Sequence, residues 1–88
     1  MPMRVAIVSP ESEVWSGEAD MVVARTLDGE IGVLPGHIPL LGVLADDQIV
    51  RVQTGGREIE ASVNGGFLSV TKDGVSILAE TAELRSGS

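Results

Sequence analysis

Glycine and proline residues divide this chain into short apolar runs, and this division restricts its fold more than any other feature. The runs are rich in Val, Ile, Leu and Ala and cover residues 3–8, 19–25, 31–34, 40–44, 48–53, 57–63, 67–70 and 75–80. Short runs with many β-branched side chains are typical of strands, whereas a stable helix needs a longer periodic segment. About eight to ten such strands without a helix predict an all-β protein, an antiparallel β-sandwich or flattened barrel.

The clearest local prediction is a hairpin formed by residues 48–53 and 57–63. The Thr-Gly-Gly sequence between them supplies glycines for the positive φ angles of a tight turn. Along both runs apolar residues alternate with polar or charged ones, which predicts one buried face and one face in water. Lys72-Asp73-Gly74 predicts a second hairpin, and Ser16-Gly17 predicts a turn before the run 19–25.

The length of 88 residues suits a single domain. We expect the β-sandwich over residues 1–82 and a frayed tail over 83–88, because Ser86-Gly87-Ser88 stops any helix that begins near Thr81. Cysteine is absent, so no disulfide or thiolate metal site is expected. No apolar stretch approaches the ~20 residues that span a bilayer. These features predict a soluble, cytoplasmic protein.

Acidic residues outnumber basic ones, with thirteen Asp and Glu against six Lys and Arg and a net charge of −7. The basic residues are scattered along the chain and form no cluster. Nucleic acids and anionic lipids would be repelled by such a surface, because both are bound through clustered Lys and Arg. The charge therefore predicts protein partners, with no nucleic acid and no direct membrane insertion.

Residue types that carry catalysis are few. Cys and Tyr are absent, His37 is the single histidine, and neither a Gly-x-Ser-x-Gly elbow nor a phosphate-binding Gly-x-x-x-x-Gly-Lys loop occurs. Asp46-Asp47 is interpreted as a turn, and Glu58 with Glu60 as the wet face of a strand. His37 and one nearby carboxylate do not complete a metal site of three or four ligands. We predict no catalytic, metal-binding or cofactor-binding residue, no cofactor and no small-molecule substrate.

The segment 28–41 has an unusual composition, with three glycines and two prolines in fourteen residues beside several large aliphatic side chains. One interpretation is a tight connection between strands. The other is a preformed loop that docks a partner, because prolines reduce the entropy lost on binding and apolar tips provide contact area. The residues alone leave both interpretations open.

The same segment resembles the signature of the epsilon subunit of bacterial F-type ATP synthases, the subunit called delta in mitochondria. Four further motifs occur in the order of that family: Ser9-Pro10-Glu11, Ser16-Gly17-Glu18, Gly65-Gly66-Phe67 and Ile77-Leu78-Ala79-Glu80. Family members combine an N-terminal ten-stranded β-sandwich with a helical hairpin of about fifty residues, and this chain resembles the sandwich alone. It also has Asp46-Asp47-Gln48 where family members often place a glycine.

The resemblance implies a non-catalytic subunit of the central stalk that binds the gamma subunit and rests on the c-subunit ring. It implies a peripheral position on the cytoplasmic face of the bacterial cell membrane, where the complex couples proton flow to ATP synthesis. The hairpin's inhibitory and ATP-binding roles are not implied, because the hairpin has no counterpart here.

The resemblance also implies partner-binding residues. Those of the loop that contacts the ring are Asp28, Gly29, Glu30, Ile31 and Gly32, and those that shape the neighbouring surface are Pro35, Gly36, His37, Pro39, Leu40 and Leu41.

Two alternative functions would require other sequence features. A free-standing module that binds carbohydrate or peptide would need exposed aromatic residues, and only Trp15 and Phe67 are aromatic. A small metal-dependent enzyme would depend on His37 with nearby acids.

Overall fold

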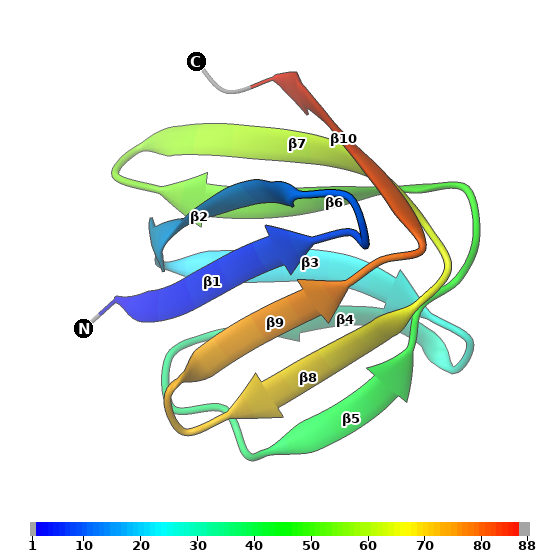
Figure 1. The fold of residues 1–88 in the computed structure, drawn as a ribbon. Coiled ribbons are helices and arrows are strands. Elements are labelled where there is room, and N and C mark those ends of the chain that lie inside the picture. The colour runs from blue at the N-terminus through cyan, green and yellow to red at the C-terminus, as the bar shows by residue number, and fades with distance from the viewer. Residues whose placement is uncertain (1, 87–88) are drawn as a thin grey trace.

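Ten strands make up the part of the chain that the structure, a computed structural model, describes, namely residues 2–86 (Figure 1). Within that range no residue is helical. The strands are β1 (Met3–Val8), β2 (Glu13–Ala19), β3 (Met21–Thr26), β4 (Gly29–Val33), β5 (Leu40–Val43), β6 (Gln48–Thr54), β7 (Arg57–Asn64), β8 (Phe67–Thr71), β9 (Gly74–Leu78) and β10 (Thr81–Ser86). The predicted all-β class is confirmed.

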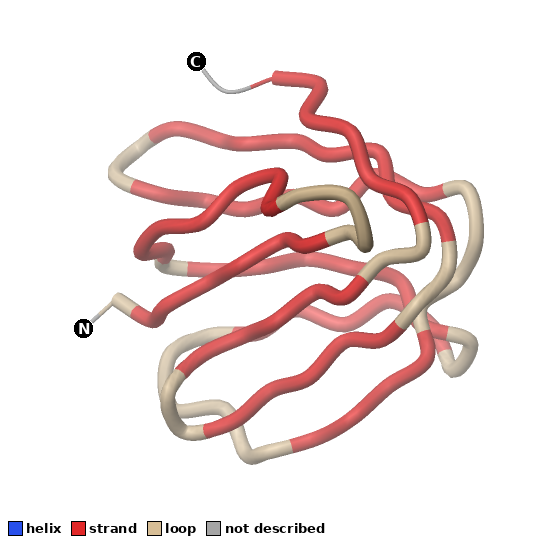
Figure 2. The backbone as a smooth tube through the Cα atoms, in the orientation of Figure 1, coloured by secondary structure: helices blue, strands red, loops and turns tan. Residues whose placement is uncertain are grey.

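The strands form two five-stranded sheets that pack face to face as a β-sandwich (Figure 1). The first sheet has the order β2-β1-β9-β8-β5, and the second has the order β10-β7-β6-β3-β4. Every neighbouring pair is antiparallel except β1 and β9, which run parallel. The chain passes between the sheets several times, and loops at the two ends of the sandwich carry these crossings (Figure 2).

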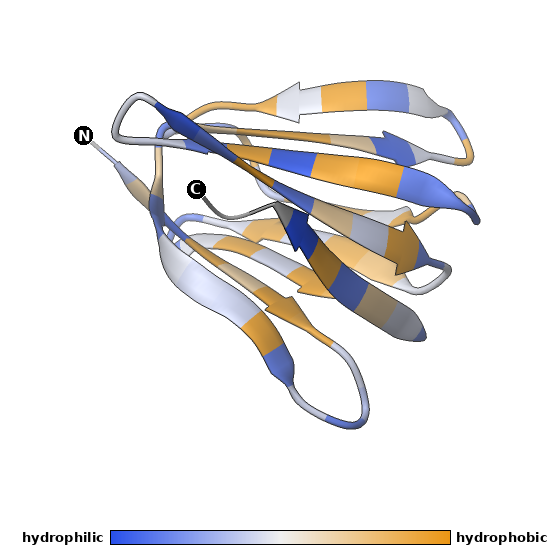
Figure 3. Ribbon diagram, turned by 90° about the horizontal axis from the view of Figure 1, so that it is seen from above, coloured by the Kyte–Doolittle hydropathy of each residue, from blue (hydrophilic) through white to orange (hydrophobic). Residues whose placement is uncertain are grey.

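The core is aliphatic, because alternate residues of most strands point between the sheets. Figure 3 shows hydrophobic and hydrophilic residues alternating along these strands. The buried apolar residues are Met3, Val5, Ile7, Ala19, Val22, Ala24, Val33, Leu44, Val50, Val52, Ile59, Ala61, Val63, Leu68, Val70, Val75, Ile77 and Ala79. Half-buried Trp15 packs against this cluster at the edge strand β2. Phe67, the other aromatic residue, is half exposed on β8 and lies outside the cluster.

The predicted hairpin is present as β6 and β7, with Thr54 paired to Arg57 across the turn. Gly55 and Gly56 have φ angles of 57° and 82°, which residues other than glycine adopt only at a cost in free energy. The second predicted hairpin joins β8 and β9, with Thr71 paired to Gly74.

Two sequence predictions are corrected. Ser16-Gly17 was predicted to form a turn, but both residues lie inside β2, and the chain turns at Asp20. A Cβ atom on Gly17 would lie 3.0 Å from the ring of Trp15, so this glycine makes room for the indole. A frayed tail was predicted from residue 83, but β10 continues through Ser86, because β7 offers it a free edge from Glu60 to Asn64. Residues 87 and 88 lie outside the described range.

Candidate docking surfaces

The structure divides the predicted docking segment 28–41 between the two ends of the sandwich. Asp28 lies in the turn between β3 and β4, at the end where the amide of Leu27 donates a hydrogen bond of 2.9 Å to the carbonyl of Val43 at the close of β5. Residues 34–39 connect the end of β4 to the start of β5, at the other end of the sandwich (Figure 1). The five residues of β4 separate the two parts by roughly 13–16 Å. The segment therefore supplies two surfaces.

The β3–β4 turn is held by its own hydrogen bonds. The hydroxyl of Thr26 donates to the carbonyl of Gly29 at 3.1 Å and accepts from the amide of Asp28 at 3.2 Å. Gly29 has a φ of 126°, which the turn requires and which favours glycine. Glu30 is paired with Arg25 across the two strands and is exposed. The turn thus presents the carboxylates of Asp28 and Glu30 on a fixed backbone.

The β4–β5 connection is a compact loop with apolar tips. The amide of His37 donates to the carbonyl of Leu34 at 3.0 Å, and His37 Nδ1 lies 2.7 Å from the carbonyl oxygen of Ile38. The imidazole is therefore bonded to its own loop. Ile38 in the connection and Leu41 in β5 are 74% and 72% exposed, so their aliphatic side chains are free to contact a partner.

Sequence reasoning missed a row of apolar side chains on the outer face of the first sheet. Val43 pairs with Phe67, Phe67 with Leu78, and Leu78 with Val8, so these residues lie side by side across β5, β8, β9 and β1. Val43, Phe67 and Leu78 are 46%, 49% and 47% exposed. We call these residues the apolar row. The available signal was the alternation of β8, where Leu68 and Val70 face the core and Phe67 must face outward.

A hollow of about 330 Å³ lies beside the apolar row, bordered by Val8, Pro10, Phe67 and Leu78. Contiguous exposed apolar surface of this kind is typical of a protein interface. The ends of β1 and β9 and the start of β8, which border this hollow, lie at the same end of the sandwich as the β3–β4 and β9–β10 turns (Figure 1). These two turns carry Asp28 and Glu80, and we call this end the acidic end.

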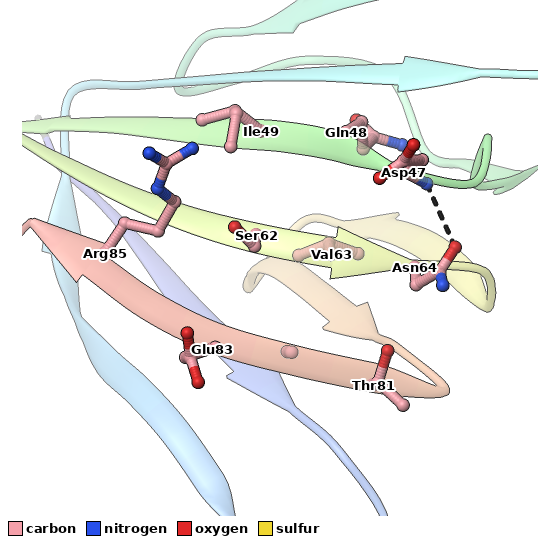
Figure 4. Close-up of a pocket in the computed structure, with 10 residues that line it drawn as sticks. Asp47, Gln48, Ile49, Ser62, Val63, Asn64, Thr81, Glu83 and Arg85 are labelled. Carbon is pink, nitrogen blue, oxygen red and sulfur yellow. Dashed lines mark hydrogen bonds between the residues drawn. The ribbon is translucent and has the colours of Figure 1, made fainter.

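The outer face of the second sheet is charged. Arg51 Nε lies 3.6 Å from Glu60 Oε2, between β6 and β7. A larger hollow of about 460 Å³ crosses β6, β7 and β10, and its walls include Ser62, Glu83 and Arg85 (Figure 4). Acids and a base share this hollow, which does not favour an anionic ligand. Among residues 2–86, no three His, Asp or Glu side chains lie close enough together to hold a metal ion.

No helix in the described part of the chain is both long enough and apolar enough to cross a membrane.

Comparison with known proteins gives one consistent family. Residues 2–85 match the family model described as ATP synthase, Delta/Epsilon chain, beta-sandwich domain. An ATP synthase epsilon chain of Frankia casuarinae is 77% identical over 84 residues, which are 96% of this chain and 99% of the relative. An ATP synthase epsilon chain of Mycobacterium sp. strain KMS is 58% identical over 85 residues, covering 96% of this chain and 70% of the relative.

Solved structures share the same fold. A chain in the Euglena gracilis mitochondrial ATP synthase, in a complex of OSCP, F1 and c-ring, superimposes with a TM-score of 0.86 at 26% identity. The match covers 94% of this chain and 53% of that one, so this chain spans about half the length of its Euglena counterpart. A chain in the central stalk and c-ring of the Tetrahymena thermophila mitochondrial ATP synthase has the same fold, with a TM-score of 0.77 at 16% identity. This chain therefore belongs to the family of ATP synthase delta/epsilon chains, and its residues 2–85 form the β-sandwich domain of that family.

Proposed function

We propose that this chain is a non-catalytic subunit of the central stalk of an F-type ATP synthase, docked on the gamma subunit and on the c-subunit ring. It acts at the cytoplasmic face of the bacterial membrane and helps couple proton flow to ATP synthesis. The observation that carries the proposal is the apolar row, which gives a member of this family a ready surface for a permanent protein partner.

The apolar row is the surface that we assign to the gamma subunit. Four apolar side chains lie in one line across neighbouring strands, and the hollow beside them can accept a partner's side chain. Residues at the centre of such a surface contribute most of the binding free energy, because they are fully desolvated in the complex. Phe67 is central in the row and is its only aromatic member.

The β3–β4 turn is the surface that we assign to the c-ring, with Asp28, Gly29, Glu30, Ile31 and Gly32 as its residues. The connections at this end of the sandwich carry the carboxylates of Glu11, Asp28, Asp46, Asp47 and Glu80, and they include no Lys or Arg. The family resemblance implies ring loops that contain arginine. Opposite charges would steer the two parts together and fix their register.

The β4–β5 connection and the start of β5 supply the remaining proposed contacts. Those of the connection are Pro35, Gly36, His37 and Pro39, and those of β5 are Leu40 and Leu41. This region lies at the other end of β4, so it cannot share one small patch with Glu30. It therefore meets a different partner or a different part of the same partner.

The fold suits mechanical coupling. Both sheets enclose one continuous aliphatic core, and the turns of the β3–β4 end are bonded across the two sheets by Leu27 to Val43 and by Ala45 to Arg25. Elements with many buried contacts open only at a free-energy cost close to that of global unfolding. A load applied at one interface is thus transmitted to the other with little internal deformation.

The deciding experiment is capture of purified gamma subunit by the purified chain, with circular dichroism to verify a folded β protein. Stoichiometric capture by the folded chain is the expected result. A folded chain that captures neither gamma nor a reconstituted c-ring would contradict the proposed function.

A further inference from the structure

The β3–β4 hairpin is only partly joined to the rest of the second sheet. β3 pairs with β6 at Met21, Val22 and Val23, and the pairing stops there. Arg25, two residues further on, lies in β3 before the turn and has no backbone partner on β6. Without another connection, the end of the hairpin that carries Glu30 would be free to splay from the sheet.

The side chain of Gln48 supplies the missing connection. Its Oε1 accepts a hydrogen bond of 2.7 Å from the amide of Arg25, and its Nε2 donates to the carbonyl of Arg25 at 2.6 Å. Nε2 also donates to the carbonyl of Ala45 at 2.8 Å. A primary amide carries one acceptor and two donor hydrogens, so this side chain bonds to both backbone groups of Arg25 as a neighbouring strand would.

Gln48 is buried, so the loss of these hydrogen bonds would be costly in free energy. The residue is only 6% exposed, and Val50 and Val52 follow it on the core side of β6. A buried amide is costly unless its polar atoms are hydrogen-bonded, and here the oxygen accepts one bond and the nitrogen donates two. The glutamine at this core-facing position of β6 therefore serves to bond the backbone of Arg25 and Ala45.

The same bonds tie the hairpin to the first sheet. The amide of Ala45 donates to the carbonyl of Arg25 at 2.9 Å, and Thr26 forms a bridge with Leu44, just after β5. Gln48 lies at the centre of this junction, bonded to both Arg25 and Ala45. The positions of Asp28 and Glu30 relative to both sheets depend on the junction.

We propose that Gln48 is a positioning residue: its side-chain amide replaces a backbone rung between β3 and β6 and so fixes the β3–β4 turn that contacts the c-ring. The part that concerns the ring rests on the proposed function. The part that concerns the rung does not, and it is tested separately by hydrogen exchange.

The first test uses the unaltered chain. Amide exchange followed by NMR should show the Arg25 amide protected to a level near that of the β7 amides, although no backbone carbonyl accepts its hydrogen bond. An unprotected Arg25 amide would overturn the proposal. This measurement needs neither a variant nor a partner.

The second test compares Gln48→Met with Gln53→Met. Both replace a glutamine of β6 by an apolar side chain of similar length, but Gln53 is exposed and takes part in none of the three bonds to Arg25 and Ala45. In Gln48→Met we expect exchange at Arg25 to accelerate at least about tenfold, while the β7 amides change much less. Binding to a reconstituted c-ring should weaken several-fold, and binding to gamma should stay as it is. Gln53→Met should alter none of these.

Two results would overturn the proposal. Equal acceleration of all ladder amides in Gln48→Met would show that the residue supports the fold as a whole and not the hairpin. Unchanged ring binding, despite a loosened Arg25 and a chain that still binds gamma, would show that the hairpin's position does not govern docking. If the unaltered chain bound neither gamma nor ring, the proposed function would fail, and the exchange data would still decide on the rung.

Discussion

The two sheets of this sandwich have similar inner faces and very different outer faces. Inside, both sheets contribute Val, Ile, Leu and Ala to one core. Outside, the first sheet carries the apolar row, with Phe67 at its centre, whereas the second carries ion-pairing residues such as Arg51 and Glu60. Folding determines the inner residues, because each must fill space in the core. The outer residues do not have to fill the core. The difference between the apolar and the charged outer face therefore reflects whether that face contacts a partner or water.

The largest expected effect comes from removing the apolar row. The double variant Phe67→Ser/Leu78→Ser should lose at least about a hundredfold in affinity for gamma, because central apolar contacts dominate interface free energies. The free energy of unfolding should fall by only about 1 kcal/mol, because both side chains are already half exposed. Titration calorimetry with gamma and chemical denaturation would measure the two quantities.

The matched control is Val23→Ser/Ile49→Ser on the outer face of the second sheet. These aliphatic residues are partly buried and face outward, next to buried Val22 and Val50. The control should leave gamma binding unchanged. Equal losses of affinity for gamma in the two double variants would contradict the assignment of gamma binding to the first sheet alone.

A smaller effect is expected at the acidic end of the sandwich. Glu30→Lys should weaken binding to the c-ring about tenfold and reduce its sensitivity to salt, because an attractive exposed charge becomes repulsive. The chain should remain folded, since Glu30 is exposed on an edge strand. Glu58→Lys, on β7 beside the turn at the opposite end, is the control of equal charge change. Assembly that tolerates Glu30→Lys as well as Glu58→Lys would remove Glu30 from the contact surface.

Asp47 offers a test of stability without binding. It is the one residue other than glycine with positive φ in residues 2–86, at 56°, and its amide donates to Asn64 Oδ1 at 3.0 Å. Asp47→Gly should raise the free energy of unfolding by up to about 1 kcal/mol, because glycine adopts this conformation without strain. Asp46→Gly, beside it, should lower that free energy or leave it unchanged. Thermal unfolding of both variants would show whether the backbone conformation determines if a substitution to glycine raises or lowers the free energy of unfolding.

The smallest effect is expected from the ion pair of the second sheet. Arg51 and Glu60 are partly exposed and 3.6 Å apart, so Arg51→Ala should cost at most about 0.5 kcal/mol of unfolding free energy. Binding to gamma should not change. A marked loss of gamma binding in this variant would mean that the charged face takes part in docking and would revise the assignment of the two faces.

Local sequence patterns predicted most of the architecture. The β6–β7 hairpin followed from a Gly-Gly turn between alternating strands, and β1 coincides with the apolar run 3–8. Asp47 marks a limit of such reasoning. The turn before β6 was predicted, but its positive φ at a residue other than glycine was visible only in the structure. β10 was missed because its strand character depends on the free edge of β7, which lies far away in the sequence.

The candidate site was predicted only in part. Segment 28–41 was identified as one unit from its glycines and prolines, and the structure distributes it over both ends of the sandwich. The apolar row was not predicted at all, since its members come from four separate strands. The rung formed by Gln48 was equally hidden, because its partner Arg25 is 23 residues away.

The sequence by itself determined most strand positions, most turns, the aliphatic core and the acidic charge, because alternation, turn chemistry and charge are properties of neighbouring residues. Its motifs also determined the family. The tertiary structure alone decided which outward residues become neighbours and where Asp28 lies relative to Ile38. Such neighbours depend on strand register and sheet order, which are set by the packing of distant segments around one core.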